Sequence, residues 1–123
     1  MQILVGNTFP MSLIRRECFI VPVSSQEFKQ FIELENPEIV SFWGHKNTIR
    51  VVYQIFNIDV TPIEDRPVLR LSSNRLPYYM NKEWKQVYVI SPTYKADVGR
   101  PDPKIEVTPD MIKDWQILKI AFI

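Results

Sequence analysis

The sequence predicts an α/β fold of the α+β type, in which a mixed sheet of about five strands carries its helices on its surface. Three observations predict it. Short β-prone apolar runs alternate with segments of helical spacing, turn residues separate them, and no internal repeat or low-complexity tract interrupts the pattern. At 123 residues the chain suffices for one hydrophobic core, so we expect a single domain spanning residues 1–123.

The composition is that of a folded globule, with 46% hydrophobic and 24% charged residues. A net charge of +1 argues against a surface for duplex nucleic acid, which needs an excess of Lys and Arg. Cys18 is the only cysteine, which excludes an intrachain disulfide and a zinc cluster of Cys and His ligands. No apolar run is as long as a membrane span and the N-terminus lacks a signal-peptide pattern, so we expect a cytoplasmic protein without membrane contact.

Apolar, β-prone runs bounded by turn residues predict the strands. They are expected at residues 2–5, 19–21, 68–71, 87–90 and 118–123. Residues 72–86 form an irregular segment between the third and fourth of these strands, with Pro77 inside it.

Two helices and the start of a third are expected. Ser24 and Glu27 form a capping box at the start of a helix over residues 25–35. A second helix follows over residues 49–56, and Thr108 with a proline after it is typical of a third helix start. The apolar positions that should face the core are Phe28, Phe31, Ile32 and Leu34 in the first helix and Ile49, Val52, Tyr53 and Phe56 in the second.

The turn before the second helix contains the only histidine, His45, directly after Gly44. Backbone N–H groups at a helix start lack intrahelical partners, and together with the helix dipole they favour an anion such as a phosphate. The alternative is a helix start with a polar first turn. Asn7, just after the first strand, offers its amide either to a ligand or to its own backbone, as turn asparagines do.

Aromatic and cationic residues are interleaved in the irregular segment. The aromatic members are Tyr78, Tyr79 and Trp84, and the cationic ones are Arg75, Lys82 and Lys85. Such a combination contacts unstacked bases or flat ligands, and it also occurs in protein interfaces and in hairpin packing.

Four short motifs together resemble the viral ring nucleases, small anti-CRISPR proteins that are common in archaeal viruses and also found in phages and some cellular genomes. They are residues 4–9 (Leu-Val-Gly-Asn-Thr-Phe), residues 42–48 (Phe-Trp-Gly-His-Lys-Asn-Thr), the pair Asp65-Arg66, and residues 95–99 (Lys-Ala-Asp-Val-Gly) after a strand. The order of the elements is similar over nearly the whole chain, and the most specific part is the Gly-His-x-x-Thr turn.

The resemblance implies a homodimer whose interface pocket binds cyclic tetra-adenylate, the second messenger of type III CRISPR defence. Proteins of this family cut the ring without a metal or cofactor and so shut off immune signalling, in the cytoplasm of the infected host cell. His45 would act at the scissile phosphate by protonating the leaving 5′-oxygen while the ribose 2′-hydroxyl attacks.

The remaining site residues follow from the same resemblance. Lys95 and Asp97 would join His45 in catalysis. The expected ligand contacts are Asn7, Gly44, Lys46, Asn47, Thr48, Arg66, Ser91, Tyr94 and Gly99.

The chain departs from the family in the loop after the central strand, which in the family reads Arg-Leu-Glu-x-Gly. Lys95 and Val98 stand at the positions of the family's arginine and acidic residue, and Asp97 is the only nearby carboxylate. A lysine keeps the charge but loses the planar two-point grip of arginine on phosphate. Two alternatives therefore stay open: a sponge that sequesters a different cyclic nucleotide without cutting it, and an inhibitor that binds a host defence enzyme through the aromatic residues of the irregular segment.

Overall fold

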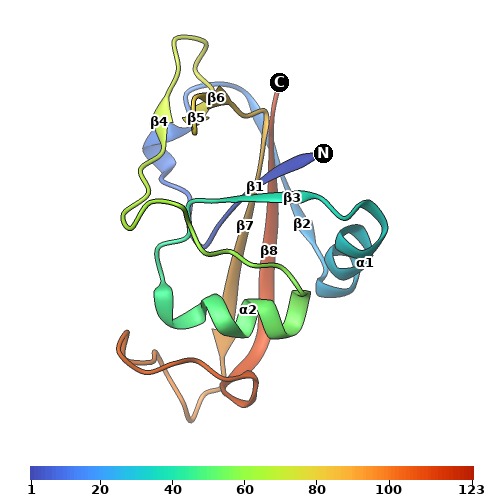
Figure 1. Ribbon diagram of the computed structural model, residues 1–123, viewed down its shortest axis with the longest axis vertical. Coiled ribbons are helices and arrows are strands. Elements are labelled where there is room, and N and C mark those ends of the chain that lie inside the picture. Colours follow the sequence, from blue (N-terminus) through green and yellow to red (C-terminus); the bar gives the residue numbers. More distant parts are fainter.

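The computed structural model describes residues 1–123 and contains the mixed five-stranded sheet that the sequence predicts (Figure 1). Its strands are β1 (Gln2–Gly6), β2 (Cys18–Val23), β3 (Glu38–Ser41), β7 (Gln86–Tyr94) and β8 (Ile112–Phe122), in the order β2-β8-β7-β1-β3. β1 lies parallel to both of its neighbours, β3 and β7, whereas β8 is antiparallel to β7 and β2. The fold is therefore α+β.

One predicted strand does not belong to this sheet, and one member of the sheet was not predicted. Of residues 68–71 only Arg70–Leu71 (β4) is a strand, and it pairs with β5 (Pro77–Tyr79) in a separate small sheet completed by β6 (Lys82–Glu83). β3 takes the fifth place in the main sheet. A strand of four residues is too short to show a clear periodicity in the sequence. Its pairing partner β1 is also distant in the chain, so no local turn signal marks β3 as a strand.

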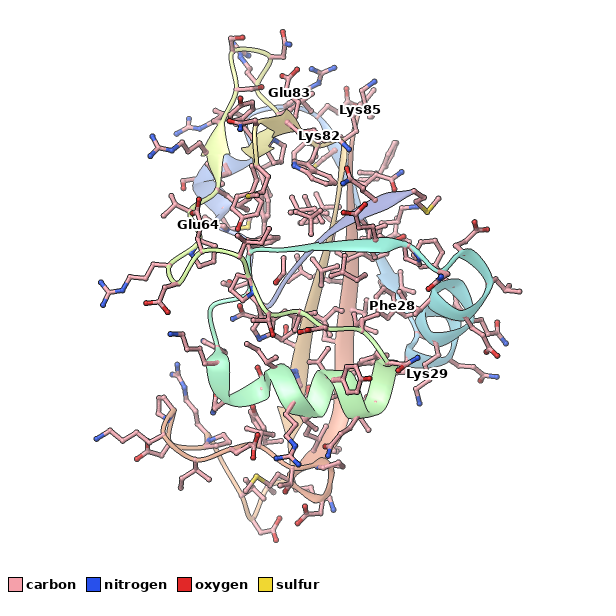
Figure 2. The ribbon with its side chains drawn as sticks, viewed as in Figure 1. Phe28, Lys29, Glu64, Lys82, Glu83 and Lys85 are labelled. Carbon is pink, nitrogen blue, oxygen red and sulfur yellow. The ribbon has the colours of Figure 1, made fainter.

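The first predicted helix is confirmed as α1 (Ser25–Glu35). The Ser24 hydroxyl accepts a hydrogen bond from the Glu27 N–H at 3.0 Å, and the helix ends at Asn36 in the left-handed conformation. Phe28 is fully buried, with its ring centroid 5.4 Å from those of both Phe56 and Tyr88, so it joins α1 to the sheet (Figure 2). Leu34 was wrongly assigned to the core, since it is 82% exposed.

The second helix, α2 (Ile49–Phe56), follows a 3-10 turn over Lys46–Thr48. Its core face is rotated from the predicted one, because Tyr53 is exposed and Val51 is fully buried. Val51 lies one turn after Asn47, whose carbonyl accepts from the N–H of the buried Val107. The loop that returns from β7 to β8 therefore covers a second side of this helix.

The predicted third helix is wrong. Only a 3-10 turn, Pro109–Met111, follows Thr108, and β8 begins at Ile112 instead of Leu118. The reason is the length of β7, whose end pairs with the start of β8 from Ser91 to Tyr94. This pairing satisfies the backbone groups of residues 112–117 as a strand.

The two faces of the main sheet are covered differently. One core cluster joins β1, β7 and β8 to α1 and α2, and it includes Ile3, Val5, Phe28, Val52 and Ile90. A second cluster joins the opposite face to the small sheet, and it includes Leu4, Leu76, Tyr79, Trp84 and Val89. Alternate residues of β1 thus belong to different clusters, as strand geometry requires. None of the helices combines the length and the apolarity needed to cross a bilayer.

Candidate functional site

The site lies at the carboxyl ends of the parallel strands. Val5 of β1 pairs with Ser41 of β3, so both strands end side by side, and β7 continues past the end of β1 after Gly6 has paired with Val89. Ligands of open α/β sheets bind outside such carboxyl ends, where connections leave in opposite directions. Asn7 and the turn with His45 therefore meet at the edge where binding is expected.

A direct hydrogen bond joins the ends of β1 and β3. The Gly44 N–H donates to Asn7 Oδ1 at 2.7 Å, which fixes the orientation of the amide. Asn7 is 8% exposed, and its Nδ2 donates to no protein acceptor. Because no side-chain nitrogen or oxygen of the protein is both buried and unpaired, this Nδ2 reaches solvent. Its amide N–H groups are therefore available to a ligand.

The turn that carries His45 is held by a buried indole. Trp43 is 1% exposed, and its Nε1 donates to the His45 carbonyl at 3.1 Å and to Thr48 Oγ1 at 2.9 Å. The Thr48 hydroxyl in turn donates to the same carbonyl at 2.8 Å. The His45 backbone is thereby fixed while its side chain is exposed, and the backbone N–H groups of Lys46 and Asn47 donate to no protein acceptor.

A pocket of about 160 Å³ opens between this turn and the end of β7. Six of the predicted site residues line it: Asn7, His45, Asn47, Thr48, Ser91 and Tyr94. Gly44 lines an adjoining hollow of about 260 Å³ together with Asn7 and His45. The structure thus brings together residues from β1, the turn after β3, and β7.

Burial raises the pKa of the Tyr94 phenol above its ordinary value of 10.0. The hydroxyl is therefore a neutral hydrogen-bond donor at physiological pH. The Asn47 side chain has another partner, because its Nδ2 donates to the Ile105 carbonyl at 3.2 Å. Its amide therefore fastens the loop between β7 and β8 to the start of α2.

The other predicted site residues do not line the pocket. Lys46 forms an ion pair with Asp65, and Arg66 is exposed beside Pro67, which lines the adjoining hollow. Lys95 and Asp97 lie exposed in the loop after β7, and their catalytic role stays a prediction.

Gly99, in the same loop, has a φ of +65°. Its N–H donates to the Lys95 carbonyl at 3.1 Å. The structure thus gives this glycine a part in the shape of the turn, because an L residue rarely adopts that conformation.

Four pocket residues were missed by the sequence reasoning. They are Pro92, Arg100, Pro101 and Pro103, of which Arg100 alone is charged. The signal was present in the Gly-Arg-Pro sequence at residues 99–101, where a glycine turn and a proline restrict the backbone on both sides of a cation. No group of three or more His, Cys, Asp and Glu side chains lies close enough together to hold a metal ion.

The aromatic residues of the irregular segment are mostly core residues. Tyr79 and Trp84 are 4% and 5% exposed, the Tyr79 hydroxyl donates to the Ser41 carbonyl at 2.9 Å, and Trp84 Nε1 donates to the Tyr79 carbonyl at 3.0 Å. Only Tyr78 remains partly exposed. Figure 2 places Lys82 at this hairpin end, far from α2, and its ammonium lies 4.3 Å from the centre of the Trp84 ring. The Tyr79 and Trp84 rings are therefore packed inside the protein, and of the three predicted aromatic contacts only Tyr78 reaches the surface.

The chain was compared with known proteins. No family model matches it, and no curated protein matches it significantly. A similar solved structure is that of B116 of Sulfolobus turreted icosahedral virus (STIV), with a TM-score of 0.57 and 16% sequence identity. The alignment covers 98% of this chain and 99% of that chain. At this identity the similarity shows that the two proteins share a fold.

Proposed function

We propose that the protein binds a cyclic oligonucleotide second messenger, cyclic tetra-adenylate, at the His45 pocket and cleaves it without a metal ion. The observation that carries the proposal is that the only histidine and the amide of Asn7 line one pocket at the carboxyl edge of the sheet. The unpaired backbone N–H groups of Lys46 and Asn47 add donors suited to a phosphodiester.

The fold gives independent support. B116, which shares it, is a protein of an archaeal virus, and the ring nucleases that the sequence motifs resemble are common in such viruses. A viral role against host defence is compatible with both facts. Removal of the messenger would end the immune signal.

The reaction is an in-line transesterification. The ribose 2′-hydroxyl attacks the adjacent phosphorus, the bond from phosphorus to the 5′-oxygen breaks, and a 2′,3′-cyclic phosphate remains on one product. His45 donates a proton to the departing 5′-oxygen, while the proton of the attacking hydroxyl passes to solvent. Asn7 and the free backbone N–H groups bind the non-bridging oxygens, where negative charge grows.

A second copy of the chain completes the site in this proposal. The pocket, at about 160 Å³, is smaller than the roughly 300–1,000 Å³ that enclose a drug-sized ligand, and a four-nucleotide ring is larger still. A neighbouring hollow of about 220 Å³ extends from Asn7 to Ile20 of β2. Phe19, Ile20 and Val21 on this edge strand are 62%, 49% and 48% exposed, which suits pairing with another chain.

The test is incubation with a panel of cyclic oligonucleotides, including cyclic tetra-adenylate, in the presence of a chelator. We expect linear products that end in a 2′,3′-cyclic phosphate. His45→Ala should lower the rate by a factor of about 100 or more while binding persists, because a general acid contributes roughly that much. If no ring is cut under any condition, the nuclease proposal is wrong.

A non-cleaving sponge is the second candidate, and one observation favours it. No carboxylate lines the pocket, since Asp97 lies outside it. Without a carboxylate as general base for the 2′-hydroxyl, the pocket would hold the ring without cutting it. Unmodified ligand recovered from heated protein, in place of linear products, would identify this function.

A further inference from the structure

The cations around the His45 pocket differ in whether they are already paired. Lys46 forms an ion pair with Asp65, and Arg50 lies 3.5 Å from a carboxylate oxygen of Glu106. Neither of these two cations lines the pocket. The charges of both side chains are therefore already paired with carboxylates of the protein.

Lys95 stands at the position of the arginine in the family that the sequence resembles, but it lies outside the pocket. The pKa of Asp110 lies below its ordinary value, mainly because the Thr108 hydroxyl donates to the carboxylate and to a smaller extent because of the Lys95 ammonium. The Lys95 N–H donates to the Met111 carbonyl at 3.0 Å, and Lys95 does not line the pocket.

Arg100 is the cation that lines the pocket, together with His45 and Asn7. No carboxylate lies within ion-pair distance of its guanidinium. The loop that carries it is restrained by Pro101 and Pro103, which line the same pocket. It is also fastened to the 3-10 turn before α2, since the Val107 N–H donates to the Asn47 carbonyl at 2.9 Å.

We propose that Arg100 is the residue that grips a phosphodiester of the bound ring, in the role that the sequence resemblance gives to the position of Lys95. The inference rests on the proposed function and names the cation of that site. A guanidinium binds two phosphate oxygens at once, which an ammonium does not do. Arg100 thus supplies, five residues further along the same loop, the planar two-point contact that Lys95 does not make.

The experiment measures the dissociation constant of cyclic tetra-adenylate for the full-length protein and three variants by calorimetry. Because a hydrogen-bonded charged contact contributes about 1.5–3 kcal/mol, Arg100→Ala should weaken binding by roughly 10- to 100-fold. Arg100→Lys should fall between this variant and the unaltered protein. Lys104→Ala is the matched control, because Lys104 is an exposed cation of the same loop that does not line the pocket, and it should change binding by less than about twofold.

Melting temperatures of the unliganded variants confirm that each is folded, which we expect because Arg100 is exposed. If the unaltered protein binds the ring and Arg100→Ala binds equally well, the inference is wrong while the proposed function stands. The same holds if Lys104→Ala shows an equal or larger loss. If the unaltered protein binds no ring, the proposed function fails and Arg100 has no phosphate to grip.

Discussion

The two ends of the molecule differ in whether their hydrogen-bond donors have protein partners. At the hairpin end, formed by β4, β5 and β6, the polar groups of Tyr79 and Trp84 bond to backbone carbonyls and the rings are buried. At the carboxyl ends of β1 and β3, Asn7 Nδ2 and the N–H groups of Lys46 and Asn47 have no protein partner. Figure 1 shows the hairpin and the loop beyond β7 at opposite ends of the long axis. Free donors, rather than aromatic and cationic composition, distinguish the proposed binding end from the packing end.

The largest expected effect on the free energy of unfolding comes from a substitution at the hairpin end. Trp84→Ala removes a ring that is 5% exposed, so we expect the free energy of unfolding to fall by about 3–5 kcal/mol in urea denaturation. Lys82→Ala is the control, because it keeps the ring and removes the cation over it together with the hydrogen bond from Nζ to Gln2 Oε1, and it should cost about 0.5–1 kcal/mol. A loss below about 1 kcal/mol for Trp84→Ala would mean that the hairpin is not part of the core.

A smaller effect on stability, with a larger one on binding, is expected at Asn7. In Asn7→Asp a carboxylate oxygen still accepts from the Gly44 N–H, while the amide donor is lost and a negative charge enters the pocket. The fold should persist, and the affinity for cyclic tetra-adenylate, measured by calorimetry, should fall about tenfold or more. Asn7→Ala is the companion variant, which loses both contacts and should also cost about 1–3 kcal/mol of stability. Unchanged binding in Asn7→Asp would show that the free amide is not used.

The smallest expected effect on the free energy of unfolding is at Asp59, a hydrogen-bonded carboxylate that belongs to neither end. The Thr61 hydroxyl, at 2.6 Å, and the Thr61 N–H, at 2.9 Å, donate to the carboxylate and hold its pKa below the ordinary 3.8. Because the folded-state pKa is depressed, this stabilisation is present above the unfolded-state pKa and is lost as the pH falls through the folded-state pKa.

Asp59→Asn tests this statement by urea denaturation at about pH 7 and at stepwise lower pH to about pH 2. The unaltered protein should be more stable than the variant at neutral pH by less than about 1 kcal/mol, since the group is exposed, and the difference should shrink on acidification. A difference that stays constant with pH would contradict the assigned cause.

Local signals predicted the helices and the His45 turn, while pairings distant in sequence decided the remaining elements. The Ser24 to Glu27 hydrogen bond that starts α1 spans three residues, so it can be recognised in the sequence. β3 was missed because its parallel partner lies at the N-terminus, and the helix expected after Thr108 became strand because β7 is long enough to pair with it.

The sequence by itself determined α1, α2, the apolar runs that become β1, β2 and β7, and an unpaired helix start with the only histidine beside it, because each depends on residues within one or two turns of chain. Only the tertiary structure decided that Asn7 bonds to Gly44, that Arg100 faces the pocket in place of Lys95, and that Tyr79 and Trp84 are buried. These outcomes depend on which strands become neighbours. That choice is made by burial and pairing summed over the whole chain, and no short stretch of sequence contains it.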